Sequence, residues 1–238
     1  MRHENRYQVI CEMLQAYDNA TGNRGADHVI KNPHEWLNNH YQPFYANAAA
    51  LIIEAREAMD TKTGGDKTII AALKRMIKNV PDHMIGSMGG IFETIDAAGS
   101  TKYTLCDGHR ILRLDQDVTS LPHVEKEKAF SSDSINKMMD DSRMNKTGEA
   151  LNLPTAAELK AFVAEQKAKH GSKNNIPYCI DGYIYVNPQY LLDFVQALPD
   201  CKAYKPANNK SPIYFIADNG DGLLLPVNPA AYQATKAA

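Results

Sequence analysis

The sequence predicts an α+β protein, with an N-terminal helical region followed by an antiparallel sheet and helices. Apolar residues recur at helical spacing over the first 80 residues, whereas short β-rich runs separated by turn residues dominate after residue 85. These strands come in hairpins and do not alternate one by one with helices, which favours a mainly antiparallel sheet. We therefore expect a helical region over 1–80, an α+β domain over 81–230 and a tail over 231–238.

Four helices are expected in the helical region. The first has one apolar face, formed by Val9, Ile10, Met13, Leu14 and Tyr17. The second opens at 32–35, where an asparagine N-cap, a proline and an N3 glutamate stand in order. The third covers about 44–59. The fourth opens at Asp66 and ends before Pro81.

The first part of the sheet domain is expected to start with a glycine-rich loop at 86–90 and a strand at 91–95. A hairpin follows, with strands at 102–106 and 109–114 around an Asp-Gly turn, since two-residue hairpin turns need positive φ. A helix is then expected over 131–143.

The second part is expected to begin with a linker at 145–153. A helix follows from Thr155 to about residue 170, because Thr155 and Glu158 form a capping box. After a hairpin at 176–186, Asn187 and Pro188 cap another helix that ends at Pro199.

The chain is expected to end with strands at 212–217 and 223–227. A hairpin followed by a helix thus occurs twice after residue 85, which hints at a duplication.

Composition excludes several classes of protein. The 238 residues carry 26 Lys and Arg against 28 Asp and Glu, a formal net charge of −2, so no bulk attraction to nucleic acid or anionic lipid is expected. The longest apolar run, 48–53, is too short to span a bilayer. The four cysteines form no C-x-x-C pair and no signal peptide precedes them, which favours reduced thiols in a cytoplasmic protein.

No motif predicts an enzyme. The nucleophile elbow, the phosphate-binding P-loop and the dinucleotide fingerprint are all missing from the sequence. The best enzymatic feature is His34, Glu35 and His40. However, six residues on a helix is about 600° of rotation, which places these histidines and His28 on opposed faces. We expect no metal, no cofactor and no catalytic residue.

Several segments, in the same order, resemble one family. Residues 103–111 read Tyr-Thr-Leu-Cys-Asp-Gly-His-Arg-Ile, residues 183–192 lead from a strand into a helix, and Ser211-Pro212 starts a strand. Residues 225–227, Leu-Pro-Val, close the series. These segments are similar to the Ala-Thr-Asp-Gly-His-Arg-Leu stretch, the last-domain helix entry, the strand start and the closing Met-Pro-Met strand of bacterial DNA polymerase III β-subunits, the sliding clamps.

The resemblance implies a clamp-like processivity fold and a non-enzymatic role in DNA replication or repair. It covers under a third of the chain, and a shortened phage or mobile-element relative would fit. In the family, the matching segments line a hydrophobic pocket that binds short peptide motifs of polymerases. Carried over by position, the peptide-binding residues are His109, Arg110, Ile111, Leu225, Pro226 and Val227.

The same resemblance implies a helical side that faces duplex DNA. The candidate DNA-facing cations lie on two predicted helices, namely Lys74, Arg75, Lys78, Lys160 and Lys167. A solvated helix face explains these cations equally well. A ring around DNA would require this chain to form a homo-oligomer. The alternative is a helical and β adaptor or structural protein with no nucleic-acid role.

Overall fold

The computed structural model of the chain describes residues 3–38, 43–62, 67–171 and 176–229. These residues form two compact units. The helical unit contains residues 1–67 together with 117–124, and the sheet unit contains residues 68–116 and 125–238. Within the described residues, no helix is long and apolar enough to cross a membrane.

The helical unit consists of α1 (His3–Thr21), α2 (Ala26–Lys31), α3 (Pro33–Asn38) and α4 (Pro43–Lys62). Its core packs Ile10 and Leu14 of α1 against Ala49 and Ile52 of α4. The expected apolar face of α1 is only partly buried, because Val9 is 43% exposed and Met13 61% exposed. Helices α1, α3 and α4 were expected and are present, whereas α2 was not expected.

Residues 117–124 belong to the helical unit although they lie between two elements of the sheet unit in the sequence. His34 Nε2 donates to the carbonyl oxygen of Ser120 at 2.8 Å, and Leu121 is buried. This segment is therefore fixed by contacts with the helices, and the chain passes from one unit to the other more than once.

The sheet unit contains a seven-stranded antiparallel sheet with the order β1-β2-β3-β9-β8-β7-β4. Its strands are β1 (Phe92–Ile95), β2 (Thr101–Cys106), β3 (Arg110–Leu114), β4 (Lys146–Leu151), β7 (Lys202–Pro206), β8 (Ile213–Ala217) and β9 (Gly220–Leu224). A separate hairpin pairs β5 (Tyr178–Ile180) with β6 (Ile184–Val186).

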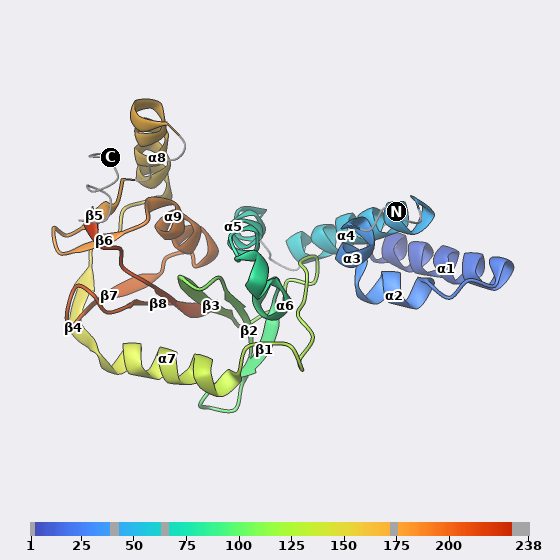
Figure 1. Ribbon diagram of the computed structural model, residues 1–238, viewed down its shortest axis with the longest axis horizontal. Helices are drawn as coiled ribbons and strands as arrows, with labels where there is room; N and C mark the ends of the chain where they lie inside the picture. Colours follow the sequence, from blue (N-terminus) through green and yellow to red (C-terminus); the bar gives the residue numbers. More distant parts are fainter. Residues whose placement is uncertain (1–2, 39–42, 63–66, 172–175, 230–238) are drawn as a thin grey trace. The chain divides into compact units, whose positions relative to one another are not determined.

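Helices cover both faces of the sheet. The helices of this unit are α5 (Lys67–Lys78), the short η1 (Asp82–Met84) and α6 (Ile85–Met88), α7 (Ser132–Met144), α8 (Ala156–His170), which packs against α9, and α9 itself (Pro188–Ala197). Figure 1 shows α7 on one face of the sheet, and α5 and α9 on the other. The predicted caps are confirmed: Thr155 and Glu158 form a capping box, and the Asn187 side chain accepts the N–H groups of residues 189 and 190.

The topology repeats one pattern. Helix α5 is followed by the meander β1-β2-β3, and helix α9 is followed by the meander β7-β8-β9. The last strands of the two meanders, β3 and β9, pair with each other at the centre of the sheet. This repeat differs from the one that the sequence suggested, a hairpin followed by a helix, because the second of those hairpins, β5-β6, lies outside the seven-stranded sheet.

The structure corrects three expectations about the sheet unit. Residues 145–153 were expected to be a linker, but β4 pairs with β7 at the edge of the sheet, and β7 itself was not expected. Lysine, glycine and glutamate dominate β4, so its own β-propensity is low and its partner strand determines its conformation. Residues 86–90 were expected to be a loop, but α6 extends to Met88. The last strand was expected over 223–227, whereas β9 covers Gly220–Leu224.

The expected boundary at residue 80 falls elsewhere in the structure. Residues 68–80 belong to the sheet unit, since the buried side chains of α5, Ile70, Leu73 and Met76, pack there. The described elements end before the expected tail, and residues 231–238 lie outside the described residues.

Gly220 is the position where the central β3–β9 pairing depends most on a missing side chain. Its φ is +154°, and a Cβ atom there would lie 2.1 Å from the carbonyl oxygen of Arg113. Gly220 and Arg113 both belong to the β3–β9 ladder, so neither backbone can move to make room for a Cβ atom without breaking ladder hydrogen bonds. We predict that Gly220→Ala lowers the free energy of unfolding by about 3 kcal/mol in urea titrations. Gly148→Ala, where nothing lies within 4 Å, is the control; equal losses would contradict this interpretation.

Candidate functional site

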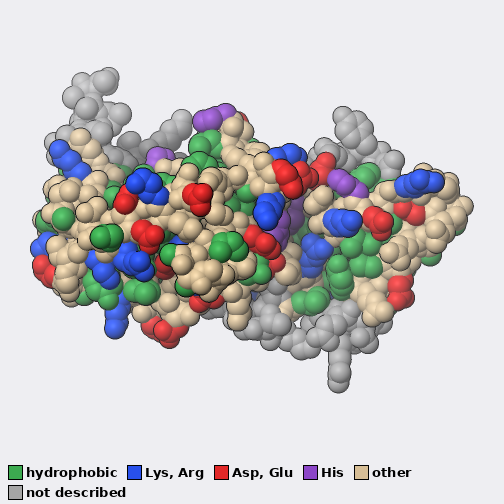
Figure 2. Space-filling view, turned by 90° about the horizontal axis from the view of Figure 1, so that it is seen from below, with side chains coloured by type: hydrophobic (Ala, Val, Ile, Leu, Met, Phe, Trp, Pro, Cys, Tyr) green, Lys and Arg blue, Asp and Glu red, His purple; other side chains and the backbone are tan. Residues whose placement is uncertain are grey.

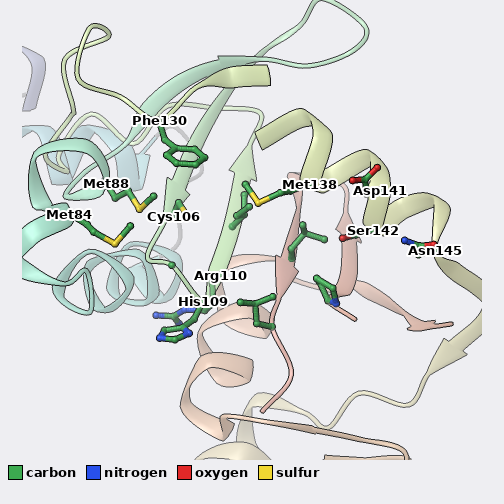
Figure 3. A pocket seen from close by; sticks show the side chains of 15 residues that line it. Met84, Met88, Cys106, His109, Arg110, Phe130, Met138, Asp141, Ser142 and Asn145 are labelled. Carbon is green, nitrogen blue, oxygen red and sulfur yellow. The ribbon is translucent and has the colours of Figure 1, made fainter. Parts of the chain in front are cut away.

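An apolar pocket of ≈430 Å³ lies in the sheet unit, at the ends of β3 and β9. Most of its lining is hydrophobic: Met84, Met88, Cys106, Phe130, Met138 and Leu223. Figure 3 shows the thioethers of Met84 and Met88 on one side of the pocket and Met138 on α7 across from them. A volume of this size accommodates a few side chains of a ligand.

The pocket brings together the two segments that the resemblance singled out. Ile111 is opposite Leu223 in the β3–β9 ladder. Just beyond the ladder, the Leu225 N–H donates to the carbonyl oxygen of His109 at 3.0 Å. His109, Ile111 and Leu225 therefore line one pocket, although more than 100 residues separate Leu225 from the other two in the sequence.

Pro226 and Val227 follow Leu225 but are not among the residues that line this pocket. The Val227 N–H donates to the carbonyl oxygen of Tyr185 at 2.8 Å, so the chain continues toward β6. The structure thus places one residue of the predicted Leu-Pro-Val segment at the pocket and the other two outside its lining.

Sequence reasoning missed the lining from η1, α6 and α7. The methionines of this lining come from segments that were expected to be a loop or an ordinary amphipathic helix. Met138, from the predicted apolar stripe of α7, lines the pocket and is 37% exposed. Three methionines in one pocket allow its shape to adapt, because the unbranched thioether side chain has many rotamers.

One side of the pocket is polar. Asp141, Ser142 and Asn145 of α7 and its C-cap lie together there, as Figure 3 shows. Asp141 is 3.6 Å from the ammonium of Lys137, and both side chains are largely exposed. The thiol of Cys106 is buried in the apolar part, and this burial raises its pKa. Deprotonated Cys106 is therefore scarce at neutral pH.

The predicted residue Arg110 is fully buried, and its guanidinium bonds to two carboxylates. Nε and Nη2 donate to Asp107 Oδ2 at 2.8 and 2.6 Å. Nη1 donates to Asp193 Oδ2 at 2.7 Å. The other carboxylate oxygen of Asp107 accepts the backbone N–H groups of His109 and Arg110. Arg110 therefore has its hydrogen bonds inside the protein and does not present its charge to the pocket.

Asp193 of α9 links this turn to α5. Its Oδ1 accepts from Arg75 Nε at 2.7 Å and from Gln189 Nε2 at 3.1 Å. Arg75 Nη2 also donates to Gln196 Oε1 at 2.5 Å. Two arginines and two aspartates thus form a network without net formal charge, which we call the Arg110 network (Arg75, Asp107, Arg110, Asp193). All of its members except Arg75 are buried.

Tyr190, in the first turn of α9, lies against His109 and Arg110. The Arg110 guanidinium carbon is 4.0 Å from the centre of its ring. The ring of His109 stacks beside it at 5.8 Å between centroids and 29° between planes. The Arg110 network therefore also bears on the orientation of His109, the exposed residue at the edge of the pocket.

The predicted DNA-facing cations lie on α5 and α8. Lys74, Lys78, Lys160 and Lys167 are exposed. Arg75 is different, because its guanidinium is paired with the fully buried Asp193. Figure 2 shows one face of the molecule, on which basic and acidic side chains are interspersed.

A second hollow, of ≈360 Å³, is polar and lies near the other end of β3. Arg113 there donates to both carboxylate oxygens of Asp221, at 2.8 and 2.6 Å, and to Asn136 at 3.2 Å. Lys102 lies 3.8 Å from Asp96, and Arg143 lies 3.1 Å from Asp140, so the charged groups of this hollow are largely paired with one another.

The described residues contain no group of three or more His, Cys, Asp or Glu side chains placed to hold a metal ion. His28 Nε2 lies 2.8 Å from Glu35 Oε2, while His34 bonds to a backbone carbonyl. His40 lies outside the described residues. All four cysteines are free thiols.

Comparison with known proteins adds no relative. No family model, no curated protein and no solved structure matches this chain.

Proposed function

We propose that the sheet unit is a sliding-clamp-like binding module that acts in DNA replication or repair without catalysis. Its pocket would bind a short apolar peptide motif of a polymerase-type partner. One observation carries the proposal: the hydrogen bond from Leu225 to His109 unites the two clamp-like segments in a single apolar pocket. The two segments resemble the clamp family in sequence alone, which does not require them to be close together in the fold.

The arrangement of the sheet unit also supports the proposal. Two helix-plus-meander repeats that meet at β3 and β9 give a sheet with α5 and α9 on one face, and the pocket is at the ends of the central strands. Strand ends beside an apolar floor suit an extended peptide, whose side chains fill the pocket. A three-methionine lining suits more than one such motif.

A role in contacting duplex DNA is the second part of the proposal. Exposed lysines on α5 and α8 would contact phosphates without reading sequence. Because Arg75 is engaged with Asp193, this surface has fewer available cations than the sequence suggests. The alternative function, an adaptor without a nucleic-acid role, would keep the peptide pocket and lack the DNA contact.

The pocket is best tested at Leu225, which is 40% exposed, whereas Ile111 is 5% exposed and within the central ladder. We expect Leu225→Asp to weaken binding of a fluorescent peptide with a bacterial clamp-binding motif by about tenfold or more, since it introduces a charge into an apolar surface. Fluorescence polarisation measures the affinity, and the urea midpoint confirms folding.

Ile216→Asp is the matched control. This residue is 42% exposed on β8 and does not line the pocket. It should bind the peptide as tightly as the unmodified protein. If the two variants bind equally, the peptide does not use this pocket.

The DNA contact is tested by its salt dependence. Removing two phosphate contacts with Lys74→Ala and Lys78→Ala should reduce the slope of log affinity against log salt by about 2. Lys202→Ala with Lys210→Ala removes the same charge from other exposed positions and should leave the slope unchanged. Binding that is absent or insensitive to salt would favour the adaptor function.

A further inference from the structure

We propose that Arg110 and Asp193 are positioning residues for the pocket: they determine the affinity for a peptide that neither side chain touches. This inference rests on the proposed peptide-binding function. It differs from the resemblance, which counts Arg110 among the residues that contact the peptide.

The first step concerns where the Arg110 side chain lies. Its guanidinium donates to Asp193 of α9, and α9 covers one face of the sheet. Helix α7, which contributes Met138 to the pocket, covers the opposite face. The side chain of Arg110 is 0% exposed. Arg110 is among the residues that line the pocket, but its side chain is fully buried and its guanidinium is bonded to Asp107 and Asp193, so a peptide in the pocket would not contact the guanidinium.

The second step concerns what the guanidinium holds. Asp107 accepts Arg110 Nε and Nη2 through one oxygen and two backbone N–H groups through the other, which closes the turn 107–110. The backbone of this turn is further constrained at Gly108, whose φ is +84°. Asp193 then fixes the closed turn to α9. Without these bonds the turn retains only its ladder partners.

The third step connects the turn to the pocket. His109 belongs to the turn, and its carbonyl oxygen accepts the Leu225 N–H. The two segments of the pocket lining that the resemblance predicts, one at His109 and one at Leu225, are thus joined by one backbone hydrogen bond. A shift of the turn moves His109 and Leu225 together, so the network prearranges the surface to which a peptide binds.

Buried charge makes the network sensitive to single substitutions. Removing one partner leaves the other charge buried and unpaired, whereas replacing a pair with apolar side chains often preserves stability. The informative variant is therefore the double substitution Arg110→Met with Asp193→Leu. Arg75→Met is a milder variant, because the Arg75 side chain is 38% exposed and lies outside the pocket.

Arg113→Met with Asp221→Leu is the matched control. This pair joins β3 to β9 by a bidentate ion pair at the other end of the ladder. The substitution removes one positive and one negative charge, as the double variant at Arg110 and Asp193 does, without touching the turn 107–110.

The experiment has two readouts in the full-length protein. The first is the affinity for the fluorescent clamp-motif peptide. The second needs no peptide: mass spectrometry measures the rate of iodoacetamide alkylation at Cys106, which lines the pocket, and at Cys201, a half-buried thiol outside it. Urea midpoints identify variants that are folded.

We expect the double variant at Arg110 and Asp193 to bind the peptide about tenfold more weakly and to alkylate faster at Cys106 but not at Cys201. Arg75→Met should give a smaller change in the same direction. If the double variant does not fold, Arg75→Met is the variant that tests the inference. The Arg113 and Asp221 control should match the unmodified protein in both readouts.

Two results would overturn the inference. Unchanged affinity and unchanged Cys106 alkylation in folded network variants would show that the turn keeps its position without the network. Equal effects in the Arg113 and Asp221 control would reduce the network to general stabilisation. If the unmodified protein binds no peptide, the proposed function fails and the affinity claim with it, while Cys106 alkylation alone reports whether the network shapes the pocket.

Discussion

The buried guanidinium of Arg110 is the constraint around which the sheet unit is organised. It lies at the start of β3, bonds to Asp107 in the preceding turn and reaches Asp193 in α9. Asp193 in turn bonds to Arg75 in α5. Since α5 and β3 belong to the first helix-plus-meander repeat and α9 to the second, the Arg110 network joins the two repeats on one face of the sheet.

Burying the charges of the Arg110 network costs solvation free energy, and their hydrogen bonds then fix one conformation of the turn. Charges taken out of water need partners with good geometry, and each carboxylate here accepts more than one hydrogen bond. The benefit is local order in a turn that otherwise depends on an aspartate and a glycine. The opposite face of the sheet, covered by α7, has the apolar pocket at one end of the β3–β9 ladder and the Arg113–Asp221 ion pair at the other.

The sequence predicts the local elements well where one short segment contains the whole signal. The capping box at Thr155 and the Asn187 cap are both decided within a few residues. The Asp-Gly turn before β3 was expected to have two residues, but Cys106 pairs with Ile111, so the turn covers residues 107–110. Strand β4 was missed because its conformation comes from pairing with β7, and its own residues favour no strand.

The candidate site divides in the same way. Its His109 and Leu225 edges could be selected from the sequence, because a family resemblance marks both. The methionine lining and the Arg110 network depend on contacts between distant segments. Asp193, 83 residues from Arg110, looks like a surface acid in the sequence, and no local pattern indicates that it is buried.

The most direct test of the central claim is a methyl NMR titration of the protein with the clamp-motif peptide. The account predicts that the methyl signals of Met84, Met138 and Leu225 shift together with saturation at one peptide equivalent, while Ile216 and Leu51 stay in place. Shifts at Ile216 or Leu51 without any at Leu225 and Met138 would place the peptide elsewhere and contradict the account.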